Sequence, residues 1–171
     1  RDAFLSAMGE NPLDGGLARE ILATPHIESV LAPESLALAR SVAESWTPPV
    51  SGDYFFRLQE RRDFERLRTL AEKKVLEEAD NLFWREQALR LGAVTGDGEW
   101  AVDRLAGTFD GPVGAAMECA RAVAACLAGC HDEAAARIQR AGVPYGLSFA
   151  QSRSAMCLLA CGDPDSATLL M

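Results

Sequence analysis

Histidine, aromatic residues and long apolar runs are all scarce in this sequence of 171 residues. It contains two histidines, and aromatic residues make up only 7% of it. Few aromatics and no run of alternating β-branched residues argue against a β-sandwich. The apolar segment after Val113 is interrupted by Glu118 and Arg121, so it is no candidate for a membrane-spanning helix. We therefore expect no membrane partner.

Motifs of catalysis and nucleotide binding are missing too. The sequence contains neither G-x-x-x-x-G-K-[ST] nor G-x-G-x-x-G. Residues 146–150 resemble a nucleophile elbow only in part, because they lack the final glycine and follow no predicted strand. A hydrolase also needs a base, usually histidine, beside its nucleophile. His26 and His131 fall at a helix start and in a turn, so we predict no enzyme activity, no catalytic residue and no cofactor.

The formal net charge is -8, and a domain this acidic repels phosphate backbones. We therefore expect no nucleic-acid partner. Residues 57–74 are the exception, with seven Lys and Arg residues against four Asp and Glu. This segment predicts either a docking patch for an acidic partner or an ordinary solvated helix with pairs such as Glu65 and Arg68. The solvated helix is the default reading of an exposed charged face.

The cysteines are odd in number and lie in helical patterns, which indicates a reducing compartment and a cytoplasmic protein. No signal peptide is visible at the N-terminus. Two pairs have helical i, i+4 spacing and could in principle surround Zn²⁺. Cys-x₃-Cys within a helix is not the usual zinc spacing, however, and buried cysteine behaves as a small apolar side chain. We predict no metal site and mostly buried, unpaired thiols at all five positions: Cys119, Cys126, Cys130, Cys157 and Cys161.

The first half of the chain is punctuated by proline and glycine. We expect a loose arm over residues 1–16, then helices at roughly 17–23, 26–31 and 34–46. Residues 47–52, with two prolines and a glycine, form the strongest break in the chain. Further helices follow at about 53–60 and 63–78. We divide the chain into an N-terminal arm with short helices, residues 1–50, and a helical domain, residues 51–171. Because the first residue is Arg, we also expect a fragment of a longer protein.

A turn pattern recurs every 33 residues in the second half of the chain. The repeated positions are Gly96, Gly129 and Gly162, and Ala101, Ala134 and Ala167. Glycine can end one helix in a left-handed cap, and the acidic residue after it can cap the next helix. Alanine lets the two helices approach closely. The pattern predicts an all-α fold of antiparallel helix hairpins that stack into a short solenoid, clearest over residues 81–171 and preceded by a shorter helical N-terminal segment.

This turn and its period resemble the tetratricopeptide repeat, in which a Gly-Asp turn joins two antiparallel helices and an Ala follows. The resemblance covers residues 81–171. Trp84 stands where the family prefers an aromatic residue, whereas Met117 and Ala150 take that place in the later units. Arg121 departs from the pattern, since the family has a small residue there. Ankyrin repeats share the period, but no Thr-Pro-Leu-His-like turn is present.

The resemblance also implies a binding face, because in this family the position after the aromatic points into a concave groove. The residues there form a polar ladder: Arg85, Glu118 and Gln151. One turn further on, an apolar strip follows: Leu89, Ala122 and Ala155. Such a face could hold the backbone and side chains of a bound peptide. Alternatively, Arg85 and Glu118 simply pair with each other across neighbouring helices, a contact worth about 0.5 kcal/mol on an exposed surface.

The sequence therefore predicts a non-catalytic scaffold of the bacterial cytoplasm that binds a peptide or a partner domain through a helical-repeat groove. The alternative is a structural or regulatory appendage of a larger enzyme whose catalytic domain lies outside this chain. The chain ends early in what should be the second helix of the third repeat, which supports the alternative.

Overall fold

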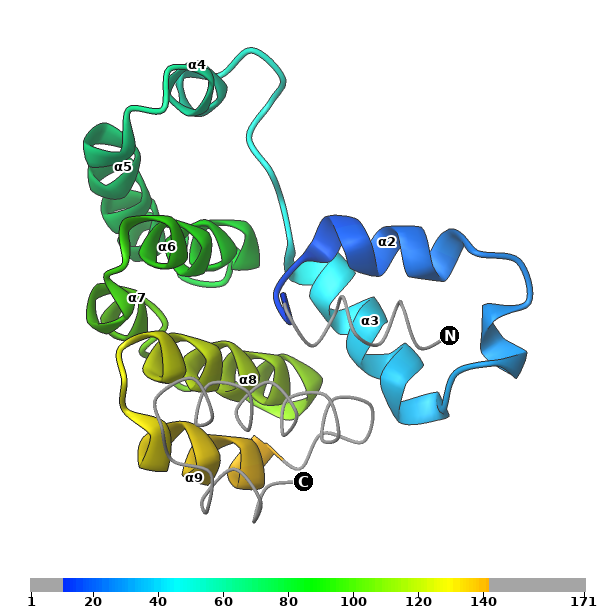
Figure 1. Cartoon of the computed structure of the whole chain (residues 1–171). Helices are drawn as coiled ribbons and strands as arrows, with labels where there is room; N and C mark the ends of the chain where they lie inside the picture. The colour runs from blue at the N-terminus through cyan, green and yellow to red at the C-terminus, as the bar shows by residue number, and fades with distance from the viewer. Residues whose placement is uncertain (1–10, 142–171) are drawn as a thin grey trace.

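The computed structural model describes residues 11–141 (Figure 1). In this range the chain forms eight α-helices and one short 3₁₀ helix, and no strand, so the predicted all-α fold is confirmed for these residues. The elements are α2 Gly15–Ala23, η1 Ile27–Ser29, α3 Pro33–Ser45, α4 Tyr54–Glu60, α5 Phe64–Glu77, α6 Leu82–Thr95, α7 Gly98–Arg104, α8 Gly111–Leu127 and α9 His131–Ala141.

Polar caps decide where most of these helices begin. An Asp or Asn side chain accepts a hydrogen bond from a backbone N–H two or three residues ahead at the start of five helices. The capping residues are Asp14, Asp53, Asp63, Asn81 and Asp97. α3 and α8 instead begin with a proline in the first turn. The helix bounds predicted for residues 17–78 lie within one or two residues of the observed ones.

The expectation of a loose arm over residues 1–16 is wrong for its last part. Residues 11–14 form a turn, and the Leu13 side chain is completely buried. Asp14 caps α2, and that helix begins at Gly15. The polar and glycine-rich composition that suggested a loose segment is in fact the start signal of a helix. Residues 1–10 lie outside the described part of the chain.

The helices from α4 to α9 follow one another in a row, and each contacts the next (Figure 1). Gly96 separates α6 from α7 with φ at 69°, and Gly129 separates α8 from α9 with φ at 79°. Both glycines therefore occupy the inter-helix turns predicted for them, in the left-handed region that favours glycine. Ala101 and Ala134, which follow these turns, are buried. Gly162 and Ala167 lie outside the described residues.

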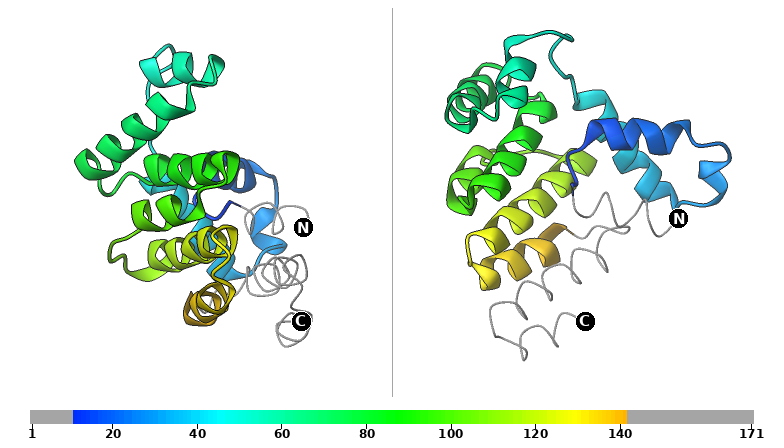
Figure 2. Two further views of the ribbon diagram at one scale, coloured as in Figure 1. Left: turned by 60° about the vertical axis from the view of Figure 1, so that its left-hand side comes forward. Right: turned by 45° about the horizontal axis from the view of Figure 1, so that its top comes forward.

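The hairpin of α2 and α3, called the N-terminal hairpin below, lies beside this row. Its helix α3 contacts α8 and α6, although these helices are distant in sequence (Figure 2). Residues 46–53 contain no helix and run from α3 to α4 at the far end of the row (Figures 1 and 2). Buried apolar side chains from the hairpin and from α4 to α8 belong to one core cluster.

Aromatic side chains join the two parts of this core. The Phe83 ring on α6 makes edge-on contacts with Trp46 at 5.3 Å and with Phe55 at 5.3 Å between ring centroids. Such edge-to-face pairs add to the stabilisation that burial alone provides. None of the described helices has the length and apolar character needed to cross a membrane.

Candidate functional site

The predicted polar ladder begins at Arg85, whose side chain is only 5% exposed in the structure. Its guanidinium donates hydrogen bonds to the carbonyl oxygens of Arg104 and Ala106, both at 2.9 Å, and to that of Ala79 at 3.2 Å. It also stacks over the Phe109 ring at 4.8 Å. Burial lowers the pKa of Arg85, and the nearby Arg121 cation adds to this effect. Arg85 thus holds the loop between α7 and α8 against α6.

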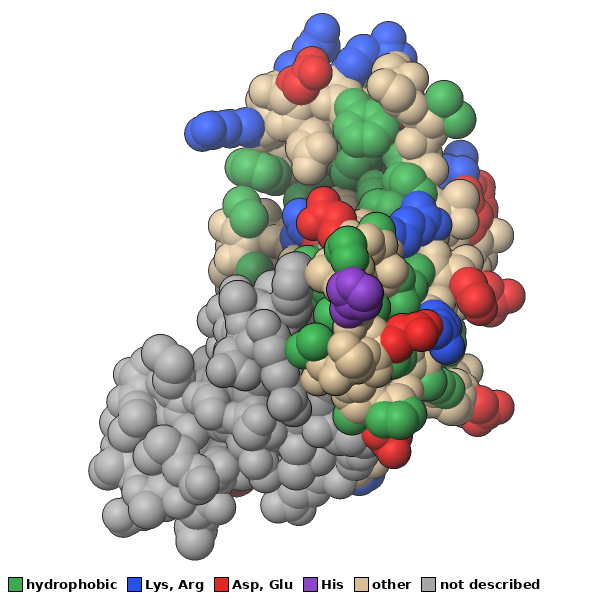
Figure 3. All heavy atoms as spheres, turned by 90° about the vertical axis from the view of Figure 1, so that its right-hand side faces the viewer, with side chains coloured by type: hydrophobic (Ala, Val, Ile, Leu, Met, Phe, Trp, Pro, Cys, Tyr) green, Lys and Arg blue, Asp and Glu red, His purple; other side chains and the backbone are tan. Residues whose placement is uncertain are grey.

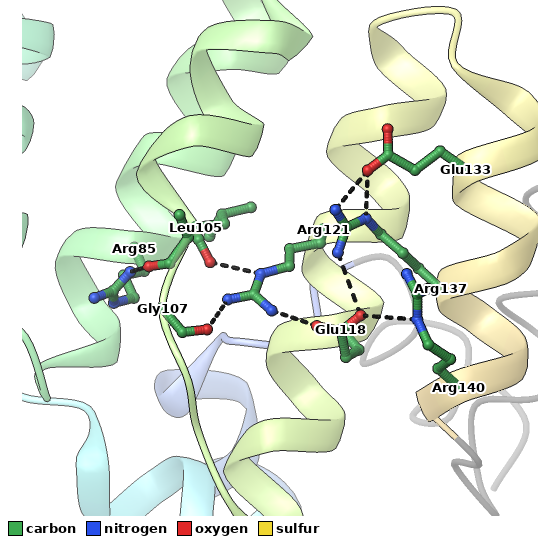
Figure 4. Close-up of polar contacts among 9 residues, drawn as sticks. Arg85, Leu105, Gly107, Glu118, Arg121, Glu133, Arg137 and Arg140 are labelled. Carbon is green, nitrogen blue, oxygen red and sulfur yellow. Dashed lines mark hydrogen bonds and ion pairs between the residues drawn. The ribbon is translucent and has the colours of Figure 1, made fainter.

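Arg121, two helices further along on α8, holds the same loop from the other side (Figure 4). Its Nε donates to the Leu105 carbonyl at 2.7 Å, and its terminal nitrogens bond the Gly107 carbonyl and the Glu118 carboxylate. The guanidinium groups of Arg85 and Arg121 together take the carbonyl oxygens of four residues in this loop region. The planar guanidinium group of arginine suits the binding of several carbonyl oxygens, because it holds its N–H donors in one rigid arrangement.

Glu118, the second ladder residue, lies in a cluster of arginines, called the Glu118 cluster below (Figure 4). Arg121 comes from its own helix, whereas Arg137 at 3.4 Å and Arg140 at 4.0 Å come from α9. Arg137 is also paired with Glu133. The alternative pairing of Arg85 with Glu118 is not observed in the described residues. The carboxylate instead joins α8 to α9.

The remaining predicted partner-binding residues occupy different surroundings. Leu89 and Ala122 are buried, so neither forms an exposed apolar strip. Gln151 and Ala155 lie outside the described residues. Glu118, with partial exposure, is the one described ladder residue with surface in contact with solvent. Whether these positions bind a partner stays a prediction.

A hollow of about 430 Å³ opens beside the Glu118 cluster. Its walls are the α7–α8 loop, the first turns of α8 and the side chain of Arg140. The lining residues include Thr108, Phe109, Asp110, Met117, Glu118 and Arg140. Gly114 keeps this region compact, because a Cβ there would lie 2.2 Å from the Phe109 carbonyl oxygen. The hollow therefore combines the half-buried Phe109 ring with charged groups of both signs.

Sequence reasoning missed a second polar cluster, between the N-terminal hairpin and α6. The Trp46 indole donates a hydrogen bond to Glu86 at 2.6 Å, and Arg90 pairs with Asp14 at 2.8 Å and with Glu86. Glu86 is 1% exposed, and desolvation by burial raises its pKa to about 7. The available signal was that Glu86 is the one carboxyl group between Asn81 and Gly96, on a helix that is otherwise largely apolar or basic.

The backbone of Thr47, in the loop after α3, adds two hydrogen bonds between the N-terminal hairpin and α6. Its backbone N–H donates to the Asn81 side chain at 3.0 Å, and its carbonyl accepts from the Asn81 amide at 2.8 Å. Asn81 at the same time caps α6. The start of α6 is thus tied to the end of α3. We refer to Asp14, Trp46 and Thr47, with Asn81, Glu86 and Arg90 opposite, as the docking interface.

The basic segment 57–74 lies on α4 and α5, at one end of the row. Lys and Arg side chains gather at this end of the molecule in the space-filling view (Figure 3). Arg57, Arg61 and Arg62 are exposed and make no ion pair within the described residues. The predicted pair of Glu65 with Arg68 is not formed there either, because Arg68 instead bonds Asp97 at 2.8 Å.

The cysteines differ from the prediction in two respects. Cys119 is buried and free, and desolvation by burial raises the pKa of its thiol to about 12. Cys130 is free but exposed. Cys126 is disulfide-bonded, so the prediction of five unpaired thiols is wrong for this residue. Cys157 and Cys161 lie outside the described residues, and in residues 11–141 no group of His, Cys, Asp and Glu is arranged to hold a metal ion.

Comparisons with known proteins give this chain no relatives: no family model matches it, and no curated protein or solved structure is significantly similar to it. Function must therefore be argued from the geometry described above.

Proposed function

We propose that this protein is a non-catalytic scaffold, built from tetratricopeptide-like helical hairpins stacked into a short solenoid, which binds a peptide or a partner domain. The observation that carries the proposal is the row of three hairpins, α4–α5, α6–α7 and α8–α9, with two equivalent glycine turns 33 residues apart. Stacked hairpins expose a long surface along the row, and in repeat architectures that surface is the part that binds.

The hollow beside the Glu118 cluster is the open part of the predicted binding face. It offers the half-buried ring of Phe109 as an apolar surface, among polar and charged groups. A peptide could place one apolar side chain there while its backbone is held by the charged rim. Arg140 is well suited to recognition, because 61% of its side chain is exposed and Glu118 holds it at 4.0 Å.

Photo-crosslinking tests this proposal directly. A photoreactive amino acid at Thr108, which lines the hollow, is expected to capture a protein in cells, whereas the same amino acid at the exposed Glu20 on α2 is not. The captured protein is then purified, and its affinity for the whole chain is measured by calorimetry. If neither position captures a protein that binds the purified chain, the scaffold proposal fails.

Charge reversal at two exposed arginines distinguishes the two candidate binding surfaces. Arg140→Glu changes the rim of the hollow, and Arg61→Glu changes the basic end of the row. Both side chains are exposed, so neither substitution should alter the helical circular dichroism. We expect Arg140→Glu to weaken binding of the captured partner about tenfold, which corresponds to one buried polar contact, and Arg61→Glu to leave it unchanged. The reverse result would move the binding surface to α4 and α5.

A further inference from the structure

Among residues 11–141, α3 is the helix of the N-terminal hairpin that lies mainly against α6 and α8. α3 contacts both α8 and α6, while the main contacts of α2 are with α3 and η1. In the described residues, the hairpin therefore rests on the row mainly through α3 and the docking interface. Its connection to α4, residues 46–53, contains two prolines and no helix, so the chain does not force α3 onto this face.

α3 is an amphipathic helix with small and branched apolar residues on its buried side. Ala39 and Val42 are completely buried and Leu38 is 3% exposed, whereas Glu34 and Arg40 are in solvent. Leu36 is buried as well, and the indole of Trp46 follows at the C-terminal end of the helix. Small residues permit close approach of α3 to the helices beneath it, as in helix-in-groove recognition.

Polar contacts at the docking interface are few, and most lie at its edge. Arg90 is 45% exposed where it meets Asp14, and Asn81 meets Thr47 in a solvent-exposed contact. Glu86 is different, because its carboxyl group is buried by the docked hairpin and water can reach it again when the hairpin leaves. The regained hydration of Glu86 offsets part of the cost of uncovering the apolar face.

We propose that the face of α6 and α8 now covered by α3 binds an amphipathic helix of a partner protein, which replaces α3 while the N-terminal hairpin moves away on residues 46–53. This inference rests on the proposed scaffold function and names the kind of partner. The helix that fits carries small apolar side chains along its buried face and an indole at its C-terminal end, because α3 itself fills the face with that chemistry. The hairpin thus covers this face of α6 and α8 and competes with the partner helix for it.

A fluorescent peptide with the sequence of residues 33–47 is the probe for this face. It is titrated into the whole chain and into the variant Trp46→Phe, which loses the hydrogen bond to Glu86 but keeps the aromatic ring. Loss of a hydrogen bond to a carboxylate favours the open state about tenfold. Because the apparent affinity scales with the open fraction, the peptide should bind the variant about tenfold more tightly than the natural chain.

Trp100→Phe provides the matched control. The Trp100 indole also donates to a carboxylate, that of Glu72 at 2.7 Å, but it lies between α5 and α7, away from the docking interface. This variant should bind the peptide no better than the natural chain. A second control is a peptide in which Val42 is replaced by Asp, which should not bind at all. Equal affinity of the first peptide for both protein variants would overturn the proposal.

Hydrogen exchange in the natural chain tests the cover without any substitution. We expect the amides of α3 to exchange when the hairpin leaves the row, an event more frequent than global unfolding. The amides of α6 and α8 should remain protected during this local opening. Exchange of α3 only on global unfolding would overturn the proposal. A dimer that the peptide cannot dissociate, seen by light scattering, would assign the face to a second copy and overturn it too. Partner capture at Thr108 without peptide binding would sink this inference while leaving the scaffold function intact.

Discussion

Glu86 is the residue whose ionisation matters most for the stability of this protein. Desolvation raises its pKa from 4.5 to about 7; Arg90 and the Trp46 indole oppose the shift, while Asp14 adds to it. Arg19 stacks on the Trp46 ring at 5.3 Å. The folded protein therefore holds this proton more tightly than the unfolded chain does. The resulting stabilisation is complete below about pH 4.5 and is lost as the pH rises to 7.

We expect the free energy of unfolding to contain a component from Glu86 that falls by up to about 1.4 kcal/mol per pH unit between pH 5 and 7. Urea denaturation of the natural chain and of Glu86→Gln over this range measures it. The difference between the two proteins should change with pH, because glutamine does not titrate. Glu72 and Glu78 have lowered pKa values, so they change their charge at more acidic pH. Both residues are present in the two proteins, so their contributions cancel in the difference. Parallel stability curves would contradict the assignment.

Arg85 is expected to be structural in the folded chain, since its donors bond three backbone carbonyls. Arg85→Met should lower the free energy of unfolding by about 2–3 kcal/mol, because buried acceptors lose a charged partner. Arg85→Lys should recover only part of this loss, since an ammonium group cannot reproduce the arginine fork. Urea denaturation measures both variants against Arg61→Met, an exposed control expected to change stability by less than about 0.5 kcal/mol. A loss for Arg85→Met no larger than for the control would refute this role.

At the scale of the helical elements, two glycines near the α6–α7 turn serve different purposes. A Cβ at Gly92 would lie 2.6 Å from the Ala101 Cβ and 2.9 Å from the Asp97 carbonyl oxygen. Nothing lies within 4 Å of a Cβ at Gly96, but its φ of 69° is unfavourable for other residues. Gly92 therefore permits close packing of α6 on α7, whereas Gly96 permits the turn itself.

The two roles predict different responses to substitution. Gly92→Ala should destabilise the protein by about 1–3 kcal/mol through overpacking, although alanine favours helix. Gly96→Ala should cost about 1–2 kcal/mol through backbone strain, and Gly96→Asn should cost less, because asparagine tolerates the left-handed region. Thermal denaturation of the three variants measures these losses of stability. Equal losses for Gly96→Ala and Gly96→Asn would show that the cost at this position is not conformational.

Local signals made the helices themselves predictable. Asp53 and Asp63 cap α4 and α5, Pro33 begins α3, and each of these starts was placed to within one residue. These signals act over three or four residues, so the sequence contains all that is needed to read them. The 33-residue spacing in the same way located the turns at Gly96 and Gly129.

The surroundings of the side chains were not predictable from the same spacing. Arg85 and Glu118 are 33 residues apart, but α7 has 7 residues and α9 has 11. The short α7 is followed by a loop whose carbonyl groups turn towards Arg85, and this contact depends on tertiary structure. A periodic pattern therefore placed the helices correctly but not the exposure of each residue on them.

At the scale of the whole molecule, the position of the N-terminal hairpin was the feature that sequence could not supply. An apolar stripe on α3 predicts that some element covers it, but not that α8 and α6 do so. Trp46 connects the two parts, because it contacts Phe83, Glu86 and Arg19 at once. Its place after α3 and before two prolines gave no hint of this role. Trp46 is consequently a central side chain in the contact between the hairpin and the row.

Gly15 and Gly16 provide a matched test of this coupling. A Cβ at Gly15 would lie 2.2 Å from the Trp46 Cβ and 2.3 Å from its Cγ, whereas a Cβ at Gly16 would come no closer than 3.2 Å to any atom, the Asp14 carboxylate being nearest. Both glycines begin α2, so alanine gives a similar gain in helix propensity at each. Gly15→Ala should therefore displace Trp46 and loosen the hairpin, while Gly16→Ala should leave it docked.

Small-angle scattering and limited proteolysis measure the result. We expect Gly15→Ala to keep its helical circular dichroism but to show a larger radius of gyration and faster cleavage within residues 46–53, because the hairpin then samples positions away from α6 and α8. Gly16→Ala should match the natural chain in both measurements. If Gly15→Ala is as compact and as resistant as Gly16→Ala, the contact of Trp46 with the start of α2 does not hold the hairpin in place. If Gly15→Ala instead loses its helices altogether, the hairpin is part of one indivisible core and cannot act as a cover.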